Sequence, residues 1–342
     1  MTLHLRRREL ETVEDVRAAL LGAVRLELST IPPYLTALYS LEPKTNVQIA
    51  QIIRSIVLEE MLHMCIACNI LNAVGGHPTI NTPGFPPQYP GQLPMGIGSE
   101  PGKPFIVPLQ KFSKKLVHDV FMVIEEPEDT IHIRKTTDLR PEYHTIGQFY
   151  TALHEKIQEL GETIFTGDAR LQVTGWFPPD ELFPIHDEDD ASRAIEVIMK
   201  QGEGTRISPK DAEGDYAHYY RFEEIFKGKH LEPNPDVPSG YSFTGPAIPY
   251  DEDGVYPMID NPSTVKLPPH TLVARYADQF DQTYTMLLNA LHATFNGEPK
   301  QLDAAIGLMY TLRLQAQELM QTPIPGHENV NAGPRWKFVA AR

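Results

Sequence analysis

The most regular pattern in this chain is a stripe of side chains that repeats at alternating steps of four and three residues over residues 46–74. The stripe is apolar except for an acid and an imidazole near its middle, and its members are Ile49, Ile53, Ile56, Glu60, His63, Ala67, Ile70 and Val74. Steps of four and three keep side chains on one face of an α-helix. Gly75-Gly76 is typical of a helix end. The pattern therefore predicts one long helix that buries this face.

A second stripe with the same spacing precedes it, over residues 13–40. Its members are Val16, Leu20, Ala23, Glu27 and Thr30. Pro32-Pro33 then predicts a kink or an interruption, because proline lacks the amide hydrogen that a helix interior needs. The connection between the two stripes is short, which predicts two antiparallel helices of a bundle.

The rest of the chain alternates helical and irregular segments. Helical patterns recur at 145–165, 189–201, 212–227, 270–296 and 300–321. Nine prolines lie between Pro78 and Pro108, and residues 228–268 are also rich in proline and glycine. The motif VFMVIEE (120–126) lies in the same long irregular excursion as the nine prolines, which ends near Pro141, and is compatible with either strand or helix.

We therefore predict a mainly α-helical bundle with long proline-rich loop insertions, folded as one domain over residues 1–342. Its helical core comprises 13–76, 145–227 and 270–321, and its irregular insertions comprise 77–142 and 228–268. The last two helices are as long as the first two and are compatible with completing the bundle themselves. In that case the later candidate ligands would lie on flanking elements.

Charge and cysteine content narrow the class of protein. The chain carries 45 acidic and 30 basic residues, a formal net charge of −15. Nucleic acids and anionic membranes are bound by basic surfaces, so we expect neither as a partner. The apolar stretch 47–74 is interrupted by Glu59, Glu60 and His63, which argues against a membrane span. Two cysteines and no apolar segment behind the N-terminal charges predict a cytoplasmic protein. A small-molecule substrate is expected, and a homo-oligomer is compatible with the sequence.

The residues that carry chemistry are Glu27, Glu60 and His63, because each occupies a position on a buried stripe. A lone buried carboxylate costs several kcal/mol, so it must be paired, protonated or bound to a metal. Glu60 and His63 are three residues apart and therefore neighbours on one helix face. A glutamate from one helix and a Glu-x-x-His from the next form the half-site of ferritin-like di-metal carboxylate bundles. Such ligands suit iron, and manganese or zinc are alternatives. A structural Glu–His ion pair is the competing interpretation.

Several motifs also resemble a known family: LELSTIPPYLTALYSL (26–41), IVLEEMLHMCIACNILNAVGGHP (56–78), TIGQFY (145–150), QGEG (201–204) and AHYYRFEEI (217–225). They are similar to the ferritin-like family found at the N-terminus of iminophenyl-pyruvate dimer synthases, the enzymes of violacein- and rebeccamycin-type biosynthesis, and in stand-alone proteins of similar length. The resemblance implies a helical bundle that holds iron and oxidises small organic molecules. It implies Glu27, Glu60 and His63 as ligands, and it points to Glu203 and His218 as the complementary ones.

The later ligands have alternatives in the sequence itself. Glu203 lies between two glycines, where a solvated turn residue fits equally well. His218 lies beside aromatic residues and is compatible with a hydrogen-bonded core histidine. Asp215 would form a second acid-x-x-His pair with His218. Gln148 stands where the family is expected to place a glutamate, and a neutral amide is a poorer ligand. One metal ion, or two unequally held, is compatible with this set.

The sequence thus predicts a non-haem iron oxidoreductase that uses dioxygen or peroxide. Its substrate would be a small organic molecule, for which the resemblance suggests an amino-acid-derived imine. The alternatives are a metal-binding or storage protein, a non-catalytic ferritin-like scaffold, and an auxiliary module whose buried Glu–His pair is structural.

Overall fold

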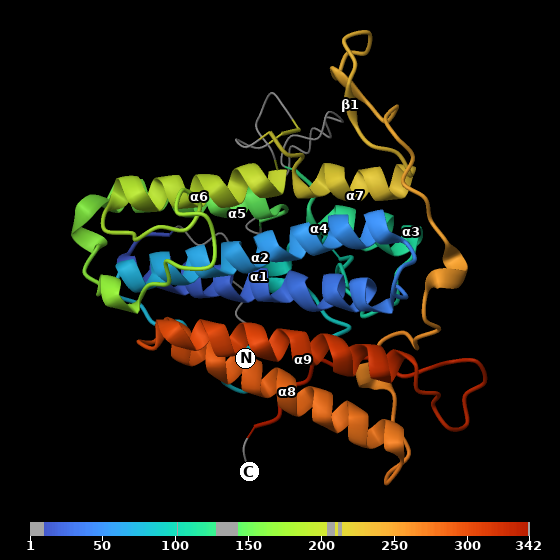
Figure 1. The fold of residues 1–342 in the computed structure, drawn as a ribbon. Coiled ribbons are helices and arrows are strands. Elements are labelled where there is room, and N and C mark those ends of the chain that lie inside the picture. Colours follow the sequence, from blue (N-terminus) through green and yellow to red (C-terminus); the bar gives the residue numbers. More distant parts are fainter. Residues whose placement is uncertain (1–9, 101, 128–142, 204–208, 211–213, 341–342) are drawn as a thin grey trace.

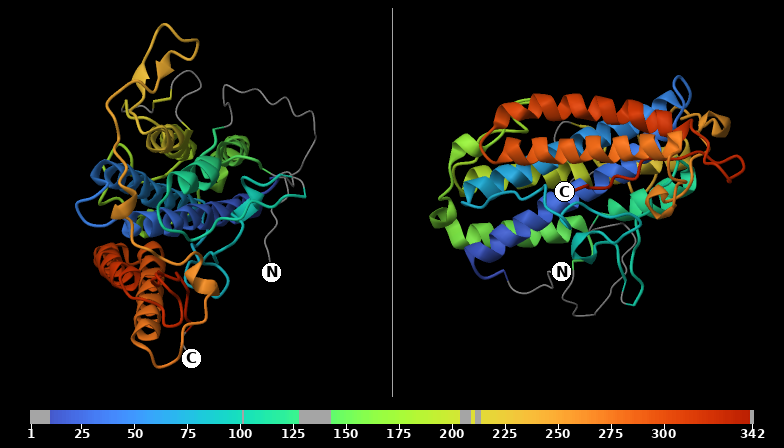
Figure 2. Two further views of the ribbon diagram at one scale, coloured as in Figure 1. Left: turned by 90° about the vertical axis from the view of Figure 1, so that its right-hand side faces the viewer. Right: turned by 90° about the horizontal axis from the view of Figure 1, so that it is seen from below.

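Helices in three layers make up the protein (Figure 1). The computed structural model describes residues 10–100, 102–127, 143–203, 209–210 and 214–340. Helices α1 (Val13–Ser40) and α2 (Val47–Ala73) form the middle layer and pack closely along their length. Shorter helices cover one side of this pair, and a C-terminal helical hairpin covers the other (Figures 1 and 2). The prediction of a mainly helical bundle is confirmed.

Helix α1 runs through Pro32 and Pro33 as one helix, so the predicted interruption is wrong. Its start is fixed by a capping box, in which Thr12 and Asp15 bond each other's backbone amides. Pro33 leaves the carbonyl of Ser29 without its usual donor, because the donor would be the amide four residues later. The hydroxyl of Tyr89 donates to that carbonyl at 2.7 Å. A hydroxyl from a loop thus replaces a missing helical hydrogen bond and keeps the helix continuous.

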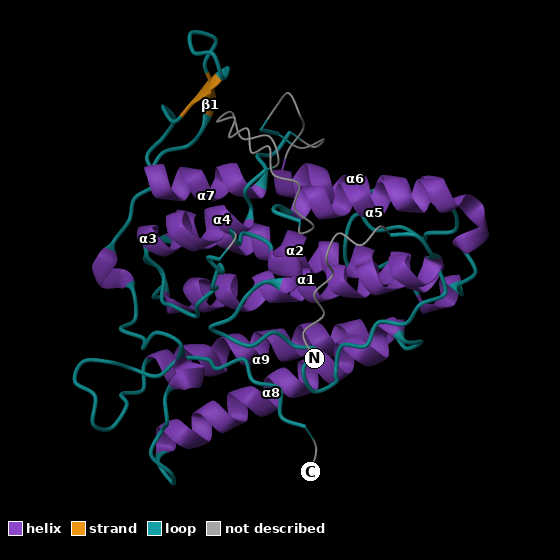
Figure 3. Ribbon diagram, turned by 180° about the vertical axis from the view of Figure 1, so that it is seen from behind, coloured by secondary structure: helices purple, strands orange, loops and turns teal. Residues whose placement is uncertain are grey.

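The layer that covers α1 and α2 on one side consists of helices broken near their middle. One row comprises α3 (Lys114–Leu116), a π-helical turn (Val117–Phe121), α4 (Met122–Ile124) and, after a break, α5 (Ile146–Leu160). The other row comprises α6 (Glu188–Glu203) and α7 (His218–Lys227). Figure 3 shows α6 and α7 following one another along the same edge of the bundle. Both breaks lie over the central part of the α1–α2 pair.

Two sequence predictions need correction in this layer. Residues 114–124 are helical, although they were predicted to belong to the irregular insertion 77–142. The helix predicted over 212–227 begins only at His218.

The two-stranded hairpin of β1 (Glu232–Pro233) and β2 (Tyr241–Ser242) lies in the second predicted insertion. Single 3₁₀ turns complete the described elements, at Pro94–Gly96, Gly161–Ile164, Ala169–Leu171, Glu252–Gly254, Pro262–Thr264 and Pro299–Gln301.

The C-terminal hairpin consists of α8 (Leu272–Phe295) and α9 (Leu302–Met320). It packs against α1 and α2 on the side opposite to α5–α7 (Figure 2). The hairpin therefore adds a layer and does not displace α6 and α7 from the bundle, which decides the alternative that the sequence left open. Beyond α9 the chain returns along α8 and buries Trp336.

Helix α2 is the core helix of the molecule. Within the described part of the chain it is the one helix long and apolar enough to cross a membrane, yet 83% of its most apolar window is buried inside the protein. Burial of that kind is expected of a helix in the centre of a bundle.

Asp281 of α8 gives the fold a pH dependence. Its side chain is 1% exposed, and Oδ2 lies 2.6 Å from Nη2 of Arg335. Burial raises the pKa of Asp281 from 3.8 to about 6, against the opposing attraction of Arg335. The folded protein therefore holds this proton more tightly than the unfolded chain does. The stabilisation that comes from protonated Asp281 is complete below its unfolded pKa of 3.8. It is lost as the pH rises from there through the folded pKa of about 6.

We expect Asp281→Asn to remove this dependence. The free energy of unfolding of the wild type, minus that of the variant, should fall by about 2 kcal/mol between pH 4 and pH 7, since one pKa unit corresponds to about 1.4 kcal/mol and part of the effect already occurs below pH 4. Denaturant titrations at each pH measure the difference, in which all other titrating groups cancel. A difference that stays constant across this range would contradict the assignment.

Candidate metal centre

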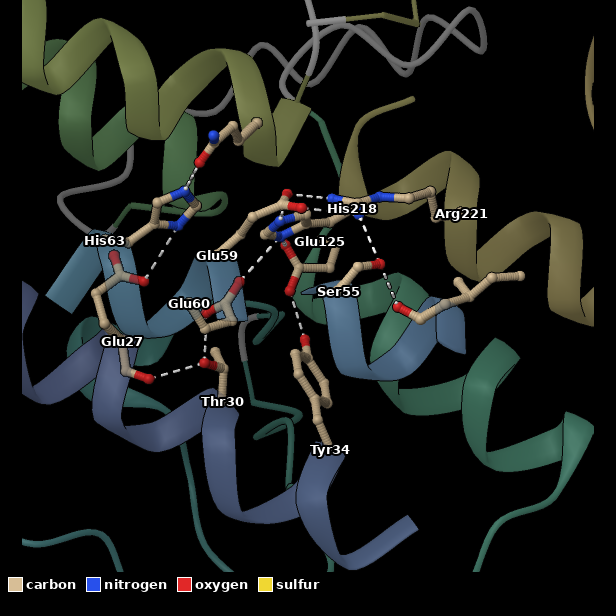
Figure 4. A network of polar contacts seen from close by, with 12 residues as sticks. Glu27, Thr30, Tyr34, Ser55, Glu59, Glu60, His63, Glu125, His218 and Arg221 are labelled. Atoms are coloured by element: carbon tan, nitrogen blue, oxygen red, sulfur yellow. Dashed lines mark hydrogen bonds and ion pairs between the residues drawn. The ribbon is translucent and has the colours of Figure 1, made fainter. Parts of the chain in front are cut away.

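Acidic and imidazole side chains from four helical segments converge between the α1–α2 pair and the broken layer (Figure 4). Glu27 comes from α1, Glu60 and His63 from α2, Glu125 from the residue after α4, and His218 from the first turn of α7. All five are buried. They form two groups, Glu27–Glu60–His63 and Glu60–Glu125–His218, in each of which one ligand atom per residue lies within 4.8 Å of the others. Glu60 belongs to both groups.

The first half of the centre is built around His63. Its Nδ1 lies 3.8 Å from Oε2 of Glu27. On the other side of the ring, Nε2 donates a hydrogen bond to Oε1 of Gln201 at 2.9 Å. The hydroxyl of Tyr150, on α5, donates to Oε1 of Glu27. Side chains from α5 and α6 thus fix where Glu27 and His63 point.

The second half is built around His218. Its Nδ1 lies 2.9 Å from Oε1 of Glu60 and 3.4 Å from Oε2 of Glu125. Its Nε2 donates to Oε2 of Glu59 at 2.9 Å. The hydroxyl of Tyr34, on α1, donates to Oε1 of Glu125. The two halves face each other, because the rings of His63 and His218 stack with centroids 5.5 Å apart.

Glu60 lies between the two halves and is oriented from α1. The hydroxyl of Thr30 lies 2.5 Å from Oε2 of Glu60, while Oε1 faces His218. Thr30 thus holds one carboxylate oxygen of Glu60 while the other faces His218, and Glu60 is the residue that both groups share.

Burial and the crowding of carboxylates perturb the titration of the centre. Burial, and next the negative charge of Glu60, raise the pKa of Glu27 well above its usual value. Burial lowers the pKa of His63 to about 4, so its ring is neutral at pH 7. Burial also opposes the charged form of His218, but contacts with Glu125, Glu59 and Glu60 raise its pKa well above the ordinary value. Groups that shift in opposite directions within one site are typical of functional centres.

These residues fit a metal ion. Nδ1 of His218 is buried and makes no hydrogen bond of good geometry to any described residue, although two carboxylates lie close to it. Three carboxylates share one buried space, where their mutual repulsion is weakly screened. A divalent cation would accept the lone pairs of the imidazoles and offset the carboxylate charge. Carboxylate and imidazole donors suit iron, manganese and zinc.

The structure brings together four of the five predicted ligands: Glu27, Glu60, His63 and His218. Glu203 is the last residue of α6, and its side chain lies outside the described part of the structure. Gln148 belongs to the start of α5, where its Oε1 accepts the amide of His144 at 2.9 Å. Asp215 is exposed and belongs to neither group.

Glu125 is the member of the centre that sequence reasoning missed. It follows the π-helical turn Val117–Phe121, whose wider spacing shifts the register of the residues after it. The stripe of four and three residues is therefore not visible in this segment. The available signal was an apolar run, VFMVI, that leads directly into Glu125-Glu126.

A small, mainly apolar cavity reaches the centre at the breaks between the short helices. The described residues that line it include Glu125 and Tyr150 of the centre, and the others are Glu126, Ile146, Gly147, Ile198, Met199 and Gly202. Gly202 leaves the space open, because a Cβ at this position would meet no described atom within 4 Å. An apolar approach to buried carboxylates limits the access of water.

A helical bundle with two adjoining carboxylate–histidine groups is compatible with a di-metal carboxylate protein. A family model described as ferritin-like matches residues 20–227, and the chain belongs to this family. A solved structure of a ferritin-like protein from Caulobacter vibrioides is similar over 95% of this chain and 98% of its own, with a TM-score of 0.67 and 24% identity. That coverage extends well beyond residue 227, so the fold of the C-terminal part is shared. No curated protein matches the chain at a significant level.

Proposed function

We propose that this protein is a non-haem iron oxidoreductase with two metal positions that share Glu60. The observation that carries the proposal is the pair of buried groups, Glu27–Glu60–His63 and Glu60–Glu125–His218, within one ferritin-like bundle. When bound, iron would supply one-electron chemistry with dioxygen or peroxide. The resemblance to the ferritin-like domain of iminophenyl-pyruvate dimer synthases suggests an amino-acid-derived imine as substrate. We place this chemistry in the cytoplasm.

The protein's own side chains would do three things in such a reaction. Glu27 and Glu125 would each hold a position while a buried tyrosine fixes one of their oxygens. His63, neutral at pH 7, would offer Nδ1 because its Nε2 hydrogen is held by Gln201. The apolar cavity beside Glu125 has room for a molecule about the size of water or dioxygen and would keep bulk water away.

Anaerobic titration with Fe²⁺ tests the proposal. We expect binding to saturate at two ions per chain, one for each group. Exposure to dioxygen should then produce new absorption at near-ultraviolet and visible wavelengths with no further iron uptake. Uptake that continues far beyond two ions per chain would identify storage instead. Failure to bind Fe²⁺ would leave the buried Glu–His contacts as structural ion pairs.

A further inference from the structure

The two halves of the centre match in their described ligands. Each half combines an imidazole with the shared Glu60 and one further glutamate. That further glutamate accepts a hydrogen bond from a buried tyrosine in both cases, Glu27 from Tyr150 and Glu125 from Tyr34. Both histidines present Nδ1 to the centre and use Nε2 elsewhere. Among the described residues, the two positions differ in the groups that hold the Nε2 atoms.

Those groups differ in charge. Nε2 of His63 donates to the neutral amide oxygen of Gln201 at 2.9 Å, whereas Nε2 of His218 donates to a carboxylate oxygen of Glu59 at the same distance. A hydrogen bond to an ionised acceptor is roughly twice as strong as one to a neutral acceptor. A carboxylate on the outer nitrogen also makes the inner nitrogen a more basic metal ligand.

The carboxylate of Glu59 is held in place from both helices. Nη1 of Arg221 donates to Oε1 of Glu59 at 2.9 Å, and Nη2 donates to Oε2. Nη1 also reaches Oγ of Ser55 at 3.0 Å, one turn before Glu59 on α2. Arg221 lies one turn after His218 on α7. The arginine thus ties the outer support of His218 to both helices that carry this half of the centre.

Gln201 is supported differently. It is 4% exposed, and its Nε2 lies 3.5 Å from Oε1 of Glu181, at the limit of a hydrogen bond. The acceptor for His63 is therefore the neutral amide of Gln201, whose described contact with Glu181 is at the limit of a hydrogen bond. The acceptor for His218 is the carboxylate of Glu59, which two nitrogens of Arg221 hold in place.

We propose that the two metal positions are unequal, and that Glu59 makes the His218 position the one that binds first and more tightly. This inference rests on the proposed function, since it assumes that both groups hold metal ions. Glu59 acts as a positioning residue, because it touches the imidazole and not the metal. The His63 position binds second and exchanges its ion more readily. Loss of an outer partner typically lowers metal affinity by about 10–100-fold.

Titration with Mn²⁺, followed by the loss of the free-ion signal in electron paramagnetic resonance, tests the order. The wild type should bind two ions in two phases. In Glu59→Gln, which keeps an acceptor for Nε2 and removes its charge, the tight phase should weaken by about tenfold or more, while the weak phase stays unchanged. Glu159→Gln, which alters an exposed acid on α5, is the matched control and should leave both phases as in the wild type.

Single-position variants assign the phases. His63→Ala should keep the tight phase, and His218→Ala should keep the weak one. If Glu59→Gln does not fold, Gln201→Glu decides, because a charge on the outer side of His63 should strengthen the weak phase by about tenfold. Two equal phases in the wild type, or an effect of Glu59→Gln on the weak phase, would overturn this inference and leave the proposed function standing. Absence of Mn²⁺ and Fe²⁺ binding in the wild type would overturn the proposed function.

Discussion

Replacing Glu60 with alanine should remove both metal ions from the protein. Glu60 is the one residue that the two groups share, so its loss leaves each position with a single carboxylate and a single imidazole. Metal content measured by mass spectrometry should fall from two ions per chain to background, and oxidation of any substrate should fall with it. The stabilisation that metal gives the wild type, about 2.7 kcal/mol per site at a concentration 100 times the dissociation constant, should also disappear.

The metal-free variant should remain folded. Three buried carboxylates repel one another without a cation, and the charge of Glu60 is one reason why the pKa of Glu27 is raised. We therefore expect the metal-free melting temperature of Glu60→Ala to equal or exceed that of the metal-free wild type. Glu196→Gln is the control, since it alters an exposed acid that pairs with Lys200. Two tightly bound ions in Glu60→Ala would exclude it as the shared ligand.

Replacing Trp336 with alanine should cost about 3–5 kcal/mol of folding stability, the usual range for a large aromatic side chain in a core. Trp336 is 2% exposed and packs edge-on against Phe280 and Tyr284 of α8, with ring centroids 5.0 and 5.3 Å away. Its Nε1 donates to the hydroxyl of Thr36 on α1 at 2.8 Å. The side chain therefore joins the C-terminal segment, the C-terminal hairpin and the central pair.

The chain's other tryptophan supplies the control. Trp176 is 59% exposed, and Trp176→Ala should change the free energy of unfolding by less than about 1 kcal/mol. Denaturant unfolding of both variants, followed by far-ultraviolet circular dichroism, makes the comparison. Equal losses in the two variants would show that the C-terminal segment does not stabilise the bundle.

The sequence predicts the long helices well because their burial follows one unbroken period. The predicted helix 13–40 coincides with α1, and the prediction for 46–74 differs from α2 by one residue at each end. Glu27, Glu60 and His63 were found for the same reason, since a polar residue on a regular apolar stripe is conspicuous. The resemblance to a known family contributed His218, whose short helix has too few turns to show a stripe.

What the sequence does not show depends on irregular backbone and on contacts between distant segments. Glu125 follows a π-helical turn within a region rich in proline, where no period can be followed. The continuity of α1 through Pro32 and Pro33 depends on Tyr89, which approaches from a loop some 60 residues along the chain. Glu59 stands next to Glu60 yet faces Arg221, and nothing in its spacing distinguishes it from a solvated acid.

The breaks in the layer above the centre have a thermodynamic consequence. Helix α7 has ten residues, and the helical segment 114–124 that precedes Glu125 has eleven, whereas isolated helices shorter than about 12–15 residues are marginal in water. These segments, which position His218 and Glu125, therefore depend on their neighbours for order. Under the proposed function, metal binding and the ordering of this layer are linked equilibria: each bound ion would stabilise the assembled helices, and local opening of the helices would release it.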